Sequence, residues 1–379
     1  MELLPAILIV LAAAGAAALT TPLVMRLARR IGAVDRPDER KVSQRDRMPL
    51  LGGLAVGTGT AVGLGIAFAG FAPRETRFQV GAFCVGALVL ILVGAWDDRF
   101  DLRAWRKLAF QIGAAALAVG AGFAFDRFSN PITGTTLLVP GWIMWPISLL
   151  WIVGVTNAVN LIDGLDGLAA GVGGIIAATL TVICWQAGQW PGVVIGLALF
   201  GALLGYLPFN FPPARIFLGD TGSLLIGYSL ALLALEGYRK TAFLAFLVPI
   251  LALAIPLLDT LLSIVRRIRS GRGVFSPDRL HMHHRLLYRE GSHRNAVLLL
   301  YFLTGCFCMI AVSFSQIDGW VSFVYLTAVV AVTIRLLRNL DAFSLEIDPA
   351  PSGPKGGERA GDEIAEIGPC SRIGEGEGK

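Results

Sequence analysis

Long apolar runs separated by short polar segments dominate the pattern of the chain. A membrane-spanning helix needs about 20 predominantly apolar residues, and by that criterion the sequence predicts about 11 spans. Their expected ranges are 3–24, 51–72, 79–95, 108–125, 142–159, 168–187, 190–207, 222–237, 241–264, 295–315 and 319–337. The pattern therefore predicts an all-α polytopic membrane protein, and a composition of 55% hydrophobic and 16% charged residues agrees with it.

The positive charges between these runs predict the orientation of the chain. When the loops are assigned alternately to two sides, most of the 32 Lys and Arg fall on one side. The other side receives only Arg74, Arg77, Arg127, Arg239 and Lys240. Because cationic loops stay in the cytoplasm, we expect the N-terminus outside, in the periplasm, and the C-terminus in the cytoplasm. The formal net charge of +5 is thus a topology signal, and no nucleic-acid partner is expected.

The composition changes near the end of the last apolar run. Residues 341–379 are rich in Gly, Pro and Glu and contain few large apolar side chains. Such a segment cannot bury enough apolar surface to fold. We expect one transmembrane domain over residues 1–340 and a disordered cytoplasmic tail over 341–379.

Polar residues gather in the loops assigned to the cytoplasmic side. Asp97 and Asp98 follow the third apolar run. They could form ordinary surface ion pairs with Arg99 and Arg103, which contribute little to stability. Alternatively, adjacent carboxylates repel each other, which raises one pKa and makes that group able to handle a proton.

A second polar set, Asn160, Asp163 and Asp166, is spaced by three residues. On a helix these side chains would lie within about 120° of one another, on one face. The alternative is that Asp163 or Asp166 caps the sixth span, with Gly164 and Gly167 as turn residues. Capping accounts for one acid but not for both acids and the amide, so the pattern favours a functional site.

The stretch "LGDTGS" places Asp220 just before the eighth apolar run. Asp220 or Thr221 could simply cap that helix. A turn of small residues with free backbone N–H groups at a helix start also binds phosphate oxygens. A carboxylate beside it could hold Mg²⁺ that bridges those phosphates.

The stretch "HMHH" places His281, His283 and His284 together, close to Arg279. A zinc site is the alternative, but no cysteine or tight carboxylate set accompanies the histidines. The cationic, hydrogen-bonding character of the stretch favours a grip for a phosphate group. The combined pattern indicates phosphoryl transfer between a soluble anionic donor and a lipid-borne phosphate, a reaction that depends on positioning and charge neutralisation.

Four motifs, in this order, carry a resemblance to a known family: "DDRFD" at 97–101, "NAVNLIDGLDGLAAG" at 157–171, "ARIFLGDTGS" at 214–223 and "DRLHMHHRLL" at 278–287. Over about residues 20–340 the chain resembles the bacterial polyprenyl-phosphate N-acetylhexosamine-1-phosphate transferases. This superfamily includes the phospho-N-acetylmuramoyl-pentapeptide transferase of peptidoglycan synthesis.

The resemblance implies a role for each matching residue. It implies that Asp97 and Asp98 are paired catalytic acids, one of which deprotonates the lipid phosphate, and that Asp220 is a ligand of Mg²⁺, with Mn²⁺ as an alternative ion. The remaining matches imply a polar set around metal and donor nucleotide and a donor-pyrophosphate site: Asn160, Asp163 and Asp166, and Arg279, His281, His283 and His284. In "DERKVS", Ser43 stands where many relatives carry histidine, which weakens any role of that loop, although Lys41 could still meet phosphate.

The resemblance also implies the reaction. The expected donor is a UDP-N-acetylhexosamine, most simply UDP-N-acetylglucosamine, and the expected acceptor is undecaprenyl phosphate in the inner membrane. The products would be a polyprenyl-pyrophosphate-linked sugar and UMP, which would begin a cell-envelope glycan such as O-antigen, teichoic acid or capsule. A homodimer is one option for the assembly. Asp101 and the interrupted histidine motif favour the N-acetylglucosamine branch over the muramoyl-pentapeptide branch, which is the alternative.

Two other classes of function compete with an enzyme. A secondary transporter could use Asp259 and Asp166 as a cation relay, because transporters place ionisable groups near the middle of the membrane. The acids here collect on one side, and the chain has no matching halves. A binding or scaffold protein without activity is disfavoured because every acid of the family motifs is present.

Overall fold

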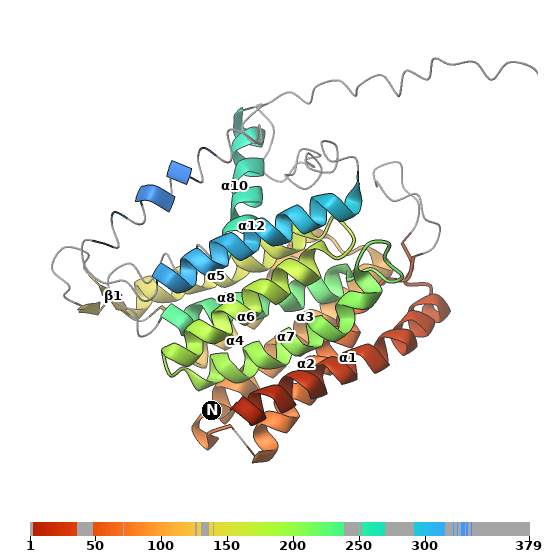
Figure 1. The fold of residues 1–379 in the computed structure, drawn as a ribbon, viewed down its shortest axis with the longest axis horizontal. Coiled ribbons are helices and arrows are strands. Elements are labelled where there is room, and N and C mark those ends of the chain that lie inside the picture. The colour runs from red at the N-terminus through yellow and green to blue at the C-terminus, as the bar shows by residue number, and fades with distance from the viewer. Residues whose placement is uncertain are drawn as a thin grey trace, which may run out of the picture. The chain divides into compact units, whose positions relative to one another are not determined.

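The computed structural model describes residues 3–35, 48–70, 72–125, 127–129, 136–138, 140–238, 250–269 except 251, 292–314 and scattered positions between 321 and 335. Helices make up almost all of this part of the chain (Figure 1). The elements are α1 (Leu3–Ile31), α2 (Gly52–Gly70), the 3₁₀ turn η1 (Arg74–Thr76), α3 (Arg77–Phe100), α4 (Ala104–Gly120), β1 (Arg127–Ser129), β2 (Thr136–Leu138), α5 (Gly141–Ile162), α6 (Leu168–Gln186), α7 (Trp190–Asn210), α8 (Gly219–Tyr238), α10 (Ala254–Arg269) and α12 (His293–Phe314).

Seven of the described helices are long and apolar enough to cross a membrane. They are α1, α2, α3 together with η1, α5, α6, α7 and α12. The expectation of a helical, multi-pass protein is confirmed for the described residues. The count of about 11 spans and the sides of the two termini stay predictions.

The structure differs from the predicted helices at three places. A short antiparallel ribbon of β1 and β2 separates α4 from α5, so the described chain is not purely helical. Helix α4 ends at Gly120, because Gly122 adopts a positive φ of 102°, although the apolar run continues through buried Phe123 and Phe125. In the expected span 241–264, Leu253 lies in a turn, and the helix that follows it runs to Arg269.

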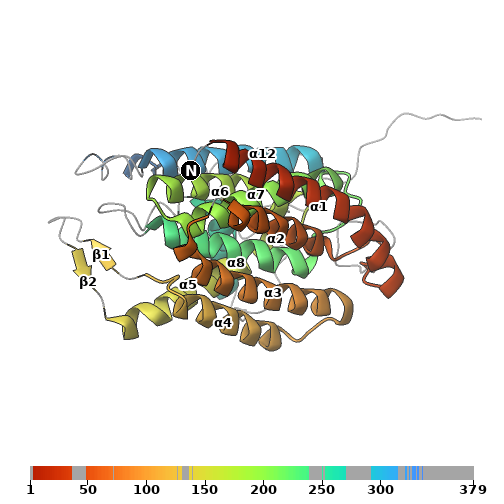
Figure 2. The same cartoon turned by 90° about the horizontal axis from the view of Figure 1, so that it is seen from below.

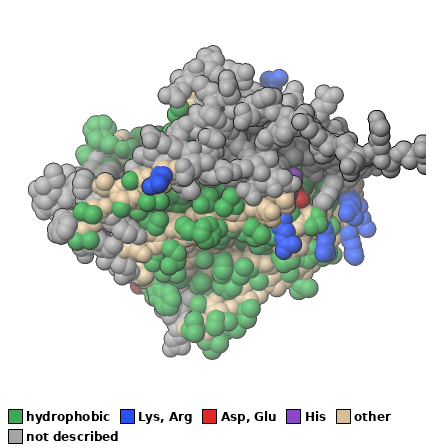
Figure 3. Space-filling model, turned by 45° about the horizontal axis from the view of Figure 1, so that its top comes forward, with side chains coloured by type: hydrophobic (Ala, Val, Ile, Leu, Met, Phe, Trp, Pro, Cys, Tyr) green, Lys and Arg blue, Asp and Glu red, His purple; other side chains and the backbone are tan. Residues whose placement is uncertain are grey.

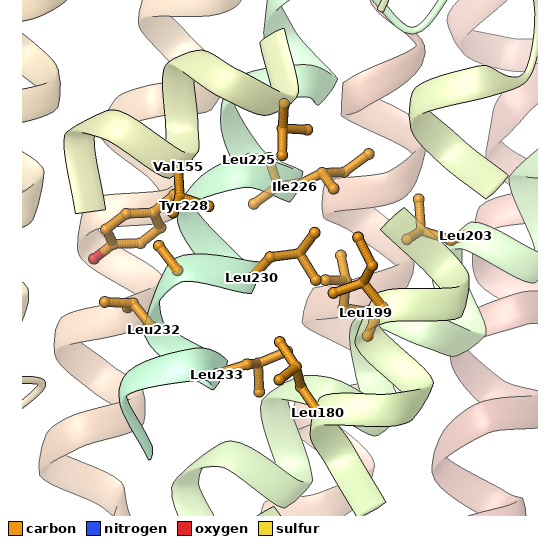
Figure 4. Close-up of a cluster of buried hydrophobic side chains, with 14 of the residues drawn as sticks. Val155, Leu180, Leu199, Leu203, Leu225, Ile226, Tyr228, Leu230, Leu232 and Leu233 are labelled. Atoms are coloured by element: carbon orange, nitrogen blue, oxygen red, sulfur yellow. The ribbon is translucent and has the colours of Figure 1, made fainter. Parts of the chain in front are cut away.

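Helix α8 is the central element of the bundle. It contacts α2, α3, α5, α6 and α7, and every residue from 221 to 237 is buried. Figure 2 shows α3, α4 and α5 on one side of α8 and α6, α7 and α12 on the other. The core around it consists of interdigitating aliphatic side chains from α5, α6, α7 and α8 (Figure 4), including Val155, Leu180, Leu199, Leu203, Ile226 and Leu230.

Small residues allow the helices to approach closely. A Cβ atom added at Gly205 of α7 would overlap the backbone of Ala14 in α1, and one added at Gly53 of α2 would overlap the backbone of Gly222 in α8. Close backbone contact of this kind replaces the hydrophobic effect as the source of helix association in lipid. The glycines therefore fix where the start of α8 lies relative to α2.

The outer surface is apolar. On the face drawn in Figure 3, hydrophobic side chains cover most of the described surface, and several Lys and Arg side chains gather at one end. Leu19 and Trp142 are each 77% exposed, which is expected of side chains that face lipid rather than water. The distribution supports a bundle embedded in a bilayer.

The contact between α7 and α1 can be tested with Gly205→Ala. We expect this substitution to lower the free energy of unfolding by about 1–3 kcal/mol, because the added methyl group must push α1 away. The control is Gly154→Ala in α5, where an added Cβ has no heavy atom within 4 Å. Thermal denaturation in detergent should show a lower Tm for Gly205→Ala only; equal Tm values would contradict the close contact.

Candidate active site

Asp97 and Asp98 lie in the last turn of α3, not in a loop after it. The helix continues to Phe100 and ends at Asp101, which has a left-handed φ of 54° and donates its N–H to the carbonyl oxygen of Asp97. The longer helix gives both carboxylates a rigid support. It also directs them toward the start of α8.

Asp98 binds the N-terminus of α8. Its Oδ1 accepts a hydrogen bond from the backbone N–H of Asp220 at 2.7 Å. Its Oδ2 accepts from the backbone N–H of Thr221 at 3.2 Å and from the Thr221 hydroxyl at 2.5 Å. These are the N–H groups that a helix start leaves without helical partners, and a carboxylate there is favoured by the helix dipole. The prediction that this turn offers free N–H groups is therefore wrong for these two groups.

Lys107 of α4 bridges two carboxylates. Its Nζ lies 2.9 Å from Oδ2 of Asp97 and 2.5 Å from Oδ2 of Asp220. The other oxygen of Asp97 accepts the backbone N–H of Leu102 at 2.7 Å. Sequence reasoning missed Lys107, because a single lysine after an acidic motif has no distinctive pattern. Its spacing of ten residues from Asp97, across the α3–α4 turn, is the one signal that could have indicated it.

Asn160 holds Asp220 from the opposite side. Its Nδ2 donates to Oδ1 of Asp220 at 3.0 Å and to the hydroxyl of Ser223 at 2.8 Å. Each oxygen of Asp220 thus has a different partner, Lys107 on one and Asn160 on the other. The structure brings α3, α4, α5 and α8 together at this carboxylate.

Asp163 and Asp166 lie in a turn between α5 and α6. Helix α5 ends at Ile162, so the prediction that Asn160, Asp163 and Asp166 share one helix face is wrong. The capping alternative is also wrong, because Gly167, with a φ of 76°, occupies the N-cap of α6 and no side chain caps that helix. Oδ2 of Asp166 instead accepts the backbone N–H of Ala214 at 3.0 Å.

Backbone contacts fix the segment that precedes α8. The N–H of Gly52 donates to the carbonyl oxygen of Phe217, and the N–H of Gly53 donates to the carbonyl oxygen of Leu218. The N–H of Phe217 in turn donates to the carbonyl oxygen of Pro49. The turn between α5 and α6 is also held: the hydroxyl of Tyr301 in α12 donates to the carbonyl oxygen of Gly167 at 2.5 Å. Elements distant in sequence therefore converge on the acidic cluster.

The cluster carries more negative than positive charge. Burial raises the pKa of Asp163 well above its usual value, and the nearby carboxylates of Asp220, Asp98 and Asp166 raise it further. The ammonium of Lys107 forms ion pairs with two of the acids, Asp97 and Asp220. Such an excess of carboxylate oxygens favours binding of a further cation.

The donor set fits Mg²⁺ of the kind that bridges phosphates. In the described ranges no three His, Cys, Asp or Glu side chains form a group that could hold a metal ion. Mg²⁺, however, commonly uses only one or two carboxylates and completes its shell with water and substrate phosphates. Asp220, with Asn160 beside it, has the required oxygen ligands at the point where the negative charge is concentrated.

Five predicted residues lie outside the described residues, so the structure does not place them: Lys41, Arg279, His281, His283 and His284. Asp259 is placed, inside α10, and is only 1% exposed.

Asn210, at the end of α7, was not predicted. Its Nδ2 donates to the carbonyl oxygen of Ile216 at 2.9 Å, while its buried Oδ1 has no hydrogen-bond partner among the described residues.

Comparison with known proteins assigns the chain to a family. Residues 80–238, which include every described acid of the cluster, match the family described as glycosyl transferase family 4. A Bacillus subtilis protein named "Probable undecaprenyl-phosphate N-acetylglucosaminyl 1-phosphate transferase" is 41% identical over 303 residues, which cover 80% of this chain and 83% of that protein. The chain belongs to glycosyl transferase family 4.

Two relatives with lower identity match with similar coverage. The decaprenyl-phosphate N-acetylglucosaminephosphotransferase of Mycobacterium tuberculosis H37Rv is 39% identical over 74% of this chain and 76% of its own length. The undecaprenyl-phosphate alpha-N-acetylglucosaminyl 1-phosphate transferase of Escherichia coli K12 is 31% identical over 73% and 74%. This family 4 protein is therefore a membrane-bound sugar-phosphate transferase, as the sequence motifs predicted.

The raised pKa of Asp163 predicts a stability gain for Asp163→Asn. Above the ordinary Asp pKa of about 3.9, the folded protein retains a proton that the unfolded chain has lost, so this group makes stability fall as pH rises. The neutral amide removes that effect. We expect a higher Tm than wild type at pH 8, measured in detergent without divalent cations, with the difference shrinking toward pH 4. Asp101→Asn, at an exposed carboxylate, is the control; a lower Tm for Asp163→Asn at pH 8 would contradict the electrostatic account.

Proposed function

We propose that the protein transfers N-acetylglucosamine 1-phosphate from UDP-N-acetylglucosamine to a polyprenyl phosphate, namely undecaprenyl phosphate. An oxygen of the lipid phosphate forms a bond to the sugar-linked phosphorus of the donor. The bond between that phosphorus and the oxygen of UMP breaks, and UMP leaves with the bonding electrons. The products are a polyprenyl-pyrophosphate-linked sugar and UMP, and the lipid product begins a cell-envelope glycan.

The observation that carries this proposal is the acidic cluster around Asp220 at the end of an apolar bundle. Transfer between phosphates brings several negative charges together, and catalysis relies on neutralising and positioning them. The ammonium of Lys107 and the amide of Asn160 reach Asp220 from two helices. The names of the relatives given above support the choice of sugar and lipid.

We assign the proton of the lipid phosphate to Asp97 rather than to Asp98. Asp98 has both oxygens engaged by the N-terminus of α8, so protonation there would weaken the hydrogen bonds that hold that helix. Asp97 has one oxygen on a backbone N–H and the other on Lys107, whose side chain is 23% exposed. A proton taken up at Asp97 therefore leaves the hydrogen bonds that hold the start of α8 in place.

Asp220 and Asn160 are the residues we assign to Mg²⁺. Bound Mg²⁺ would neutralise phosphate charge and align the donor. Asp163 and Asp166 lie beside that position, and Asp166 also holds the segment before α8 through Ala214. The histidine stretch at 281–284, with Arg279, is proposed to bind the donor pyrophosphate. We place this site at the cytoplasmic face of the inner membrane, where the basic loops are predicted.

An isotope-exchange assay tests the reaction and names the donor. Purified protein in detergent would receive Mg²⁺, undecaprenyl phosphate, labelled UMP and one of three donors: UDP-N-acetylglucosamine, UDP-N-acetylgalactosamine or UDP-N-acetylmuramoyl-pentapeptide. We expect label to enter UDP-N-acetylglucosamine, and only when the lipid is present. Label in the pentapeptide donor would support the alternative branch, exchange without lipid would indicate a two-step route, and no exchange with any donor would refute the proposal.

The assignment of the metal predicts the behaviour of Asp220→Asn. We expect exchange to fall by about 100-fold or more, because one strong charge interaction at the reacting phosphates is lost. The protein should still fold, since Asn retains an oxygen that can accept a hydrogen bond. Asp101→Asn serves as the matched control and should retain activity. Full activity in Asp220→Asn, with the same dependence on Mg²⁺ as wild type, would exclude the assignment.

A further inference from the structure

A pair of amide side chains joins α4 to α5 one helical turn from the acidic cluster. Nδ2 of Asn157 donates to Oε1 of Gln111 at 2.8 Å, and Nε2 of Gln111 donates to Oδ1 of Asn157 at 3.4 Å. The second hydrogen of the Asn157 amide goes to the carbonyl oxygen of Val153 at 2.8 Å. The two side chains therefore satisfy each other in surroundings where an unpaired amide is costly.

Among the described residues, the pair forms the side chain-to-side chain hydrogen bonds between α4 and α5. The buried stripe of this helix consists of Gln111, Ala114, Ala115, Ala118 and Val119. Alanines slide and rotate against a neighbouring helix with little change in contact, whereas a reciprocal amide pair forms in one register only. The opposite side of α4 is exposed and apolar, with Trp105 63% and Ile112 45% exposed, so lipid contacts give no register either.

The register of α4 decides where Lys107 lies. Lys107 precedes Gln111 by four residues, which is about 6 Å along the same side of the helix. Asn160 follows Asn157 by three residues, about 4.5 Å along α5. Lys107 and Asn160 both contact Asp220, one on each carboxylate oxygen. A shift of α4 on α5 would therefore move the ammonium relative to the amide across the same carboxylate.

We propose that Gln111 and Asn157 are positioning residues, whose amide pair sets the register of α4 on α5 and so holds Lys107 on Asp220. Neither residue touches a reacting atom. Their effect on catalysis passes through Lys107. The kinetic part of this inference rests on the proposed transferase function.

The first test replaces Gln111 with Met, which has a similar length and no amide. We expect kcat of the forward transferase reaction to fall about 10- to 100-fold, because a misplacement of about 1 Å has effects of that size. KM for the donor should stay within about threefold. The double variant Gln111→Asn with Asn157→Gln restores one long and one short amide and should recover most of kcat. The control is Ser148→Ala. It removes the hydrogen bond from the backbone N–H of Phe125, which follows α4, to the Ser148 hydroxyl of α5, at the end of the two helices far from the acidic cluster, and it should leave kcat unchanged.

Combination with Lys107→Ala shows whether Lys107 transmits the effect. If Gln111 acts through Lys107, Gln111→Met should produce no further loss in the Lys107→Ala background. Losses that multiply would overturn the proposal, and so would a folded Gln111→Met variant with wild-type kcat. If Gln111→Met does not fold, the swapped pair decides: recovery of kcat supports the proposal, and a folded but slow enzyme refutes it.

Chemical labelling tests the same inference without any turnover. The rate at which acetic anhydride modifies Lys107 can be followed by peptide mass spectrometry. We expect faster modification in Gln111→Met, where the ammonium is released from its two carboxylates, and the wild-type rate in Ser148→Ala. Equal rates in all three proteins would overturn the inference. A wild-type protein without exchange activity would refute the transferase proposal but leave this result valid.

Discussion

The clustering of carboxylates at the end of an apolar bundle is the constraint on which the rest of the structure depends. Asp97, Asp98, Asp163, Asp166 and Asp220 lie close enough to influence one another, and hydrogen bonds and one ammonium group offset their mutual repulsion. Asp98 is stabilised by the N-terminus of α8, and Asp97 and Asp220 share the ammonium of Lys107. The helices that supply these partners must therefore pack in one arrangement only.

Helix α8 connects this arrangement to the core. Its buried length lies against five helices, and its first turn supplies both Asp220 and the N–H groups that hold Asp98. The glycines at which α2 meets α8, and the backbone bonds to Phe217 and Leu218, fix the position of that first turn. The packing of small residues deep in the bundle thus determines the placement of charge at its end.

The sequence was sufficient for the helical class and for several members of the cluster. Apolar runs predicted the helices, since length and hydropathy alone determine which segments can lie in lipid. The motifs correctly brought Asp97 and Asp98 together with Asp220 and Asn160, although they lie far apart in the chain. The local conformation of Asp163 and Asp166 was wrong, because a spacing of three fits both a helix and a turn ended by Gly167.

Residues whose importance arises from tertiary pairing could not be found in this way. Lys107 becomes significant only once α4 lies beside α3 and α8, and Gln111 only once it faces Asn157. Neither position interrupts the hydrophobic pattern in an unusual manner. Pairwise contacts between helices depend on rotation about the helix axis, and a single sequence specifies that rotation only weakly when the interface is alanine-rich.

The engagement of Asp98 with the start of α8 has a consequence for the design of inhibitors. Most helix N-termini attract anionic groups, and a designer would place a phosphate mimic there. At this helix two N–H groups and a hydroxyl are already satisfied from within the protein. A compound directed at the same point would gain more from a cationic substituent that meets the surrounding carboxylates, and its selectivity over ordinary nucleotide-binding proteins would follow from that reversal of charge.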